Sequence, residues 1–278
     1  MEKEKKKKLG VAAVFAVDAA ALIIGGVVWF VPHQRAVDSF NNAASGLESR
    51  NEEVDSAIEE LQNLQSGSDK PLDESLYETA SNVIGQAQAV KESVPEMPFA
   101  TEEITSKAEQ INEMGHYDDQ LKALNETKTA FADSIAQLKQ VTAPSEAFVV
   151  QRITGLSNVP GVEAATEAND PNRQLNKPGG YTAAVFFSSD LVDRSKVYSD
   201  GSGIVNAGTE GGGCVEVYST AEDAEKRNSY LGSFDGSILA SGSHEVLGTC
   251  VVRTSNLLTA SNQKLIAEEI KESLIRLD

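Results

Sequence analysis

The sequence is poor in the residues that most often form metal centres and nucleophilic active sites. It contains only two cysteines, Cys214 and Cys250, and three histidines among 278 residues. Two thiols are too few for a zinc site built from cysteine alone, and His33, His116 and His244 are scattered and form no H-E-x-x-H pattern. The sequence therefore predicts no metal centre, no cofactor and no enzymatic activity.

Basic residues are also scarce. The chain has 24 Lys and Arg against 42 Asp and Glu, which gives a formal net charge of −18 at pH 7. Nucleic acids are bound through clustered Lys and Arg that neutralise phosphates, so this balance excludes nucleic acid as an expected partner. An acidic surface of this size is instead compatible with solubility, basic partners or loosely held divalent cations.

One long apolar run stands out against this polar background. Residues 9–31, LGVAAVFAVDAAALIIGGVVWFV, contain a single charge, and the preceding tail over residues 1–8 holds five lysines. A helix of this length spans roughly 34 Å, enough for a hydrocarbon core of about 30 Å. The run predicts a single-pass transmembrane anchor in the cell membrane, a signal-anchor with the N-terminus cytoplasmic and the rest extracytoplasmic. A cleaved signal peptide, which would leave the protein secreted, is the alternative.

The single charge in that run, Asp18, lies close to its middle. An ionised carboxylate is costly at the centre of a bilayer, so its presence suggests pairing with a polar group of another membrane helix. The small residues around it would permit the close approach that such a contact needs. The alternative is that Asp18 is simply tolerated.

Residues 33–143 are predicted to form a helical stalk, either an antiparallel bundle or a coiled coil. Over residues 36–65 a heptad repeat places apolar side chains at every d position. These d positions are Phe40, Leu47, Val54 and Leu61. Asn51 falls at an a position, where a buried polar residue can fix the register of two paired chains. Asn51 is therefore the candidate oligomer seam of a homo-oligomer, and a helix that folds back on its own chain is the alternative.

Residues 145–278 differ in composition and predict a small α+β domain. Most of the glycines lie here, together with runs typical of strands at 162–166, 181–187, 213–219 and 244–254. These strands are not regularly separated by crossover helices, so a mostly antiparallel sheet with helices on one face is expected. The two cysteines fall in two of these runs, and an oxidising compartment would permit a disulfide between Cys214 and Cys250.

One loop has the alternating oxygen-bearing side chains of a weak cation site. Its candidate ligands are Asp170, Asn172, Gln174 and Asn176. A calcium loop would also need Gly at its sixth position and Glu at its twelfth, where this chain has Leu175 and Tyr181. A structured turn that begins at Asp-Pro is the simpler interpretation.

The predicted whole is a transmembrane helix, a helical stalk and an α+β domain, without motifs that specify a reaction. The most economical function is that of a membrane-anchored binding or assembly protein of the cell envelope, with another membrane or envelope protein as partner. The alternatives are a sensor or regulatory subunit of a membrane complex and an enzyme that acts on envelope polymers. Such an enzyme would need a cleft with carboxylates of perturbed pKa.

Overall fold

The computed structural model describes residues 2–198, 202–237 and 240–277, with side chains from residue 29 onward. The chain forms two compact units. The helical unit consists of the chain up to Ser66 together with Tyr77–Thr129, and the sheet unit consists of Gly67–Leu76 and the chain from Ala130 onward. The predicted boundary between stalk and α+β domain, at residues 143–145, stays a prediction.

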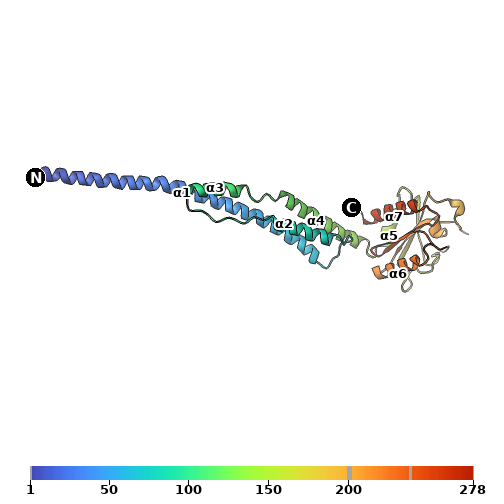
Figure 1. Ribbon diagram of the computed structural model, residues 1–278. Coiled ribbons are helices and arrows are strands. Elements are labelled where there is room, and N and C mark those ends of the chain that lie inside the picture. The colour runs from blue at the N-terminus through green and yellow to red at the C-terminus, as the bar shows by residue number, and fades with distance from the viewer. Residues whose placement is uncertain (1, 199–201, 238–239, 278) are drawn as a thin grey trace. The chain divides into compact units, whose positions relative to one another are not determined.

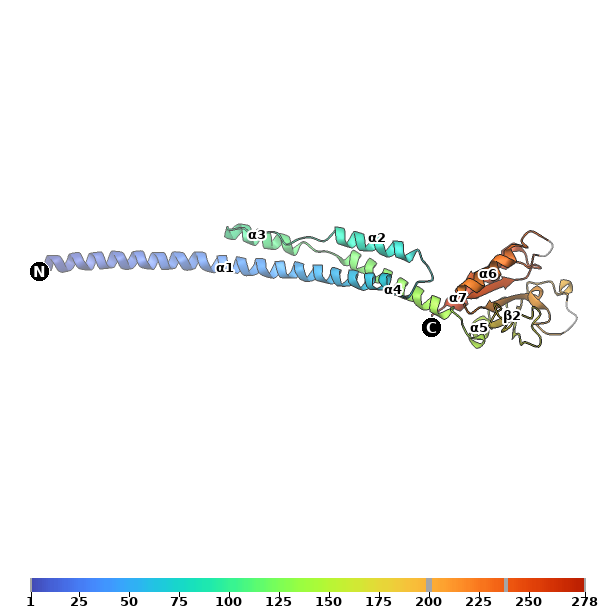
Figure 2. The same cartoon turned by 90° about the horizontal axis from the view of Figure 1, so that it is seen from below.

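The helical unit is built on one long helix, α1 (Glu2–Ser66), and the shorter helices α2 (Leu76–Ala89), α3 (Thr101–Asn112) and the first half of α4 (Asp118–Gln140). Figures 1 and 2 show α3 alongside α1. All four d positions of the heptad pattern are buried. On α1, Phe40 and Leu47 pack against Ile104 and Ile111 of α3, so the apolar seam is filled by the chain's own helices.

No helix among the residues that the structure describes is long and apolar enough to cross a membrane. This finding contradicts the predicted anchor over residues 9–31, and with it the predicted fold class and membrane localisation. The apolar run is not an element of its own, because α1 continues through Pro32 to Ser66 without a break. Asp18 lies outside the residues whose side chains are described, so its predicted membrane contact has no structural account.

The sheet unit holds five antiparallel strands in the order β1-β2-β3-β5-β4. The strands are β1 (Gly161–Ala164), β2 (Ala183–Ser188), β3 (Gly212–Val217), β4 (His244–Leu247) and β5 (Cys250–Thr254). The sequence predicted one strand over residues 244–254, whereas the structure has a hairpin there. Leu247 pairs with Cys250, so the turn has two residues, and Gly248 supplies the positive φ of 61° that such a turn requires.

Helices cover both faces of the sheet, although helices on one face alone were predicted (Figure 1). On one face, α5 (Glu146–Ile153) and α7 (Ala260–Ile275) pack over Val185, Val215 and Val252. The opposite face carries α6 (Ala221–Gly232), whose Ala224 and Leu231 pack with a smaller cluster. The first face is mostly apolar, with Glu245 at its edge paired to Lys271 of α7, whereas the α6 face contains charges buried at its centre.

Candidate ligand-binding site

A buried ion cluster lies between α6 and the sheet. Glu216 of β3 is fully buried and accepts hydrogen bonds from two arginines. Arg227 of α6 donates from Nε at 2.8 Å and from Nη2 at 3.0 Å, and Arg253 of β5 donates from Nη1 at 2.7 Å. The Tyr218 hydroxyl donates to the same carboxylate at 2.9 Å. Each oxygen of Glu216 therefore has two partners, as a buried charge requires.

The local sequence explains why these side chains meet. Alternation along β3 places Glu216 on the α6 face, and Arg253 of β5 lies on that face diagonally across the ladder. Thr220 caps the N-terminus of α6, and its hydroxyl accepts a hydrogen bond from the Asp223 amide. From that start, Ala224, Arg227 and Leu231 follow at helical spacing and share the face that meets the sheet.

The electrostatics of the cluster favour charged partners. Burial alone would raise the pKa of Glu216, but the charges of Arg253 and Arg227 and their hydrogen bonds outweigh it, and the pKa falls below its usual range. Burial opposes the charge on Arg227, yet its bonds to Glu216 hold its pKa above the usual value. Two guanidinium groups thus share one carboxylate, and Arg253 Nε has no hydrogen-bond partner among the described residues.

A loop after β1 faces this cluster and is organised by Asp170. Its carboxylate accepts hydrogen bonds from the Tyr181 hydroxyl at 2.5 Å and from the amides of Gln174, Leu175 and Asn172 at 2.7, 2.9 and 3.1 Å. Burial works against the charge, but these donors outweigh it and lower the pKa of Asp170. The Tyr181 and Tyr218 rings then meet edge to face, with centroids 6.1 Å apart, and join the loop to the ion cluster.

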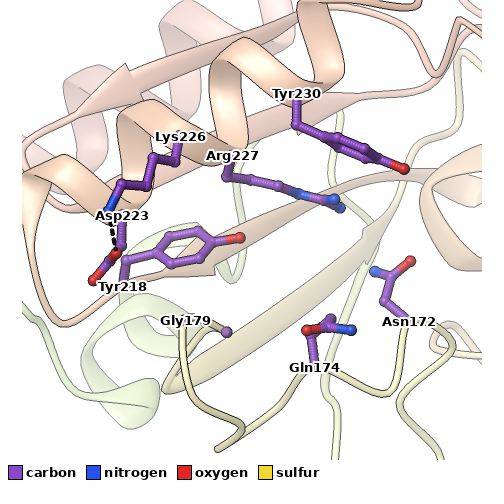
Figure 3. Close-up of a pocket in the computed structure, with 9 residues that line it drawn as sticks. Asn172, Gln174, Gly179, Tyr218, Asp223, Lys226, Arg227 and Tyr230 are labelled. Carbon is purple, nitrogen blue, oxygen red and sulfur yellow. Dashed lines mark hydrogen bonds and ion pairs between the residues drawn. The ribbon is translucent and has the colours of Figure 1, made fainter.

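A cavity of about 520 Å³ opens between the loop and α6. It is lined by Asn172, Gln174, Gly179, Gly180, Tyr218, Asp223, Lys226, Arg227 and Tyr230. In Figure 3 the Arg227 side chain extends between Tyr218 and Tyr230, with Asn172 and Gln174 on the facing loop. The volume suits a small polar molecule or the end of a polymer.

No protein-family model, curated protein or solved structure matches the chain.

The pocket's carboxylates are all engaged. Glu216 is held by the two arginines, and Asp170 by Tyr181 and three backbone amides. Asp223 accepts from the Thr220 hydroxyl at 2.8 Å, and its second oxygen lies 3.5 Å from Lys226 Nζ. What remains free to meet a ligand is a set of amide, guanidinium and phenol groups, which suits binding by hydrogen bonds.

The candidate cation ligands do not converge. Both carboxylate oxygens of Asp170 accept hydrogen bonds from its own loop and Tyr181, Asn176 donates to Glu167 at 2.9 Å, and Asn172 and Gln174 line the cavity beside α6. Among the described residues there is no group of three or more His, Cys, Asp or Glu side chains that could hold a metal ion. The loop is the structured turn that was the simpler interpretation.

The two cysteines are not brought together. Both are free and buried, Cys214 in the α6 face of the sheet and Cys250 in the opposite face. Register is the reason, because Cys214 pairs with Arg253 and Cys250 with Val217, so alternation along the strands directs the two thiols to opposite sides. The structure thus corrects the predicted disulfide. Burial raises the pKa of Cys250 to about 12 and that of Cys214 well above its usual value, so neither is a reactive thiol.

Asn51 lies in an intrachain network instead of a seam between chains. Its Nδ2 donates to the Glu92 carbonyl at 2.9 Å, and its Oδ1 accepts from the Tyr117 hydroxyl at 2.8 Å. Tyr117 accepts in turn from the Glu92 amide, and the Glu92 carboxylate accepts from the Gly115 amide. Asn51 therefore ties α1 to two connecting segments of the helical unit and does not form the predicted oligomer seam. That the chain forms a homo-oligomer stays a prediction.

The ion cluster was missed at the sequence level, although a signal for it was present. Glu216 and Arg253 are single charges of opposite sign within otherwise apolar strands, GCVEV and CVVRT. A charge in a buried strand needs a partner, so two such strands predict a buried ion pair. Arg227 gave no comparable signal, because it lies in a helix rich in charged residues.

Proposed function

We propose that the chain is a binding protein whose sheet unit recognises a small polar ligand, or the polar end of a larger one, in the cavity between α6 and the Asp170 loop. The observation that carries this proposal is the combination of a cavity of about 520 Å³ with a rigid ion cluster beneath it. Preformed pockets with a few fixed polar groups are the usual form of small-molecule sites. The helical unit is then a separate scaffold.

A binding role is favoured over catalysis by the state of the titratable groups. Glu216 and Asp170 each accept four hydrogen bonds, Asp223 accepts one from Thr220 and pairs with Lys226, and burial raises the pKa of the Tyr218 hydroxyl, which donates to Glu216. A general base needs a lone pair free for the substrate proton. These groups instead hold the pocket walls in place.

Blocking the cavity without disturbing its polar groups gives the direct test. Gly179 has a φ of 74°, and a Cβ at this position would meet nothing within 4 Å, so Gly179→Asn places a side chain in the cavity. Asn tolerates this backbone region better than most residues. Gly155, with a φ of 82° and equally open surroundings, lies outside the cavity, and Gly155→Asn is the matched control for backbone strain.

The measurement is thermal unfolding of the full chain against a panel of small polar compounds that includes carboxylates, phosphates and neutral sugars. A compound that binds the folded state raises the melting temperature. The proposal expects at least one compound to do so for the parent and Gly155→Asn but not for Gly179→Asn. A panel without any such compound, or shifts that survive Gly179→Asn, would contradict it.

A further inference from the structure

We infer that the group recognised in this pocket is an oxyanion, a carboxylate or a phosphate, bound by the outer edge of the Arg227 guanidinium. The inference rests on the proposed function, because it assigns the ligand chemistry of the same cavity. It concerns a single side chain whose orientation is fixed by Glu216 and whose remaining donors have no acceptor among the residues that the structure describes.

The geometry of the guanidinium defines the vacant edge. A guanidinium carries five N–H donors in one plane. Glu216 occupies Nε and one N–H of Nη2, and no residue in the described part of the chain accepts a hydrogen bond from Nη1. The remaining N–H groups of Nη1 and Nη2 include a parallel pair on the outer edge, and such a pair matches the two oxygens of a carboxylate or phosphate.

Arg227 is held before any ligand arrives. Its two bonds to Glu216 fix the plane of the guanidinium, and the Tyr230 ring lies 5.7 Å from its Cζ. Only 18% of the side chain is exposed. A preorganised donor loses little rotamer entropy on binding, so a small ion can be held by few contacts.

The charge directly beneath this edge is positive. One carboxylate, Glu216, faces the two guanidiniums of Arg227 and Arg253 there. The charge of Asp170 is stabilised within its own loop by four hydrogen-bond donors. Lys226 is 65% exposed and pairs with Glu222 at 3.0 Å and with the cavity-lining Asp223 at 3.5 Å, so Arg227 is the better anchor.

A neutral, hydroxyl-rich ligand is the competing chemistry. The amide side chains of Asn172 and Gln174 line the cavity, and amides both donate and accept. Such a ligand would use these amides and leave the outer edge of Arg227 without an ion. The experiment therefore needs an oxyanion arm and a neutral arm.

The test is an NMR titration of the full chain labelled with ¹⁵N-arginine, using succinate, inorganic phosphate and methyl glucoside as probes. We expect saturable shifts of the Arg227 Nη resonances with succinate or phosphate, with a Kd of about 1 mM for so small an ion. The ratio of the two affinities separates a planar carboxylate from a tetrahedral phosphate. Methyl glucoside should leave these resonances unchanged.

Three variants locate the site. Arg227→Lys keeps the positive charge but lacks the parallel N–H donors of the guanidinium, and it should weaken binding of the ion by about tenfold or more. Gly179→Asn, which leaves the ion cluster intact, should abolish it. Lys264→Gln on α7 removes one positive charge on the opposite side of the sheet and should change nothing. If Arg227→Lys fails to fold, Gly179→Asn still decides whether the ion is in the cavity.

The outcomes separate this inference from the proposed function. If methyl glucoside binds, Gly179→Asn abolishes that binding and both ions fail to bind, the oxyanion inference is wrong while the pocket remains a binding site. If the ions bind equally to Gly179→Asn, they bind elsewhere and the inference is wrong. If neither ion shifts Arg227, the inference is also wrong.

Discussion

Glu216 on β3 and Arg253 on β5 meet diagonally across one buried face of the sheet, with 2.7 Å between Oε1 and Nη1. Burying both charges is stable only because each has a partner and Arg227 adds a third group. Removing one member leaves the others with an uncompensated charge, and Glu216 is fully buried. The cluster is therefore a structural requirement of the α6 face as well as the floor of the pocket.

The first prediction concerns this cluster. Glu216→Gln removes the carboxylate that faces the two guanidiniums, and we expect the free energy of unfolding to fall by about 3 kcal/mol or more. Urea unfolding of the full chain measures the change. Glu222→Gln, an exposed carboxylate paired with Lys226 on the same helix, is the control and should change little. Equal urea midpoints for Glu216→Gln and the parent would show that the buried cluster does not hold α6.

The second prediction is a dependence of stability on pH through Asp170. Its pKa is lower in the folded protein than in the unfolded chain, so its contribution is fully present above the unfolded value of about 3.9. The contribution is lost as the pH falls through the folded pKa. Asp170→Asn should cost about 2 kcal/mol near pH 7, and the cost should shrink in acid.

Urea midpoints of the parent and Asp170→Asn, measured near pH 7 and below the folded pKa, test this sign. Tyr181→Phe removes one donor to Asp170 and keeps the ring, so it should reproduce part of the effect. A difference between parent and Asp170→Asn that grows in acid would contradict the account.

The third prediction reverses what the heptad pattern alone suggests for Asn51. In a coiled coil of two chains, Asn51→Leu should raise stability and allow a mixture of oligomeric states. In this structure the change leaves the Tyr117 hydroxyl without its acceptor and the Glu92 carbonyl without its donor, so the helical unit should lose about 1–2 kcal/mol.

Hydrogen exchange of the amides near Glu92 and Tyr117 reports this loss locally. Asn63→Leu, an exposed change on the same helix, is the control. A more stable Asn51→Leu protein with a changed oligomeric state would favour the seam between chains.

The fourth prediction contrasts two glycines. Gly85 lies inside α2 with nothing within 4 Å of a new Cβ, so Gly85→Ala should stabilise by about 0.5–1 kcal/mol through helix propensity. Gly213 lies in β3, where a Cβ would come within 2.2 Å of the Arg253 carbonyl oxygen and 2.3 Å of the Phe187 ring. Gly213→Ala should therefore destabilise. Shifts of melting temperature in the same direction for both variants would contradict this packing.

Much of the secondary structure could be predicted because it depends on local pattern. The d positions Leu47 and Val54 are buried because a period of 3.5 places them on one face of a helix, whichever helix covers that face. The pattern does not say whether the covering helix belongs to the same chain. Asn51 shows this limit, since its partners lie 41 and 66 residues further along.

The errors over the disulfide and the ion cluster share one cause, which is that sequence neighbours do not fix partners far along the chain. The two cysteines both fall in strands, but the register of β3 against β5 decides which faces their thiols occupy. The turn at Gly248 lies inside the single strand predicted over residues 244–254, because apolar residues flank it on both sides. Arg227 belongs to the site only because α6 lies over the strands that carry Glu216 and Arg253.

A crystal structure of the full chain grown with succinate or phosphate tests the oxyanion site at Arg227 most directly. We expect an oxyanion within hydrogen-bond distance of Nη1 and Nη2 of Arg227, while Nε and Nη2 keep their bonds to Glu216. The same crystals of Gly179→Asn should lack the ion in that cavity. A ligand seated on the amides of Asn172 and Gln174 with Arg227 untouched, or a cavity without any ion, would contradict the claim.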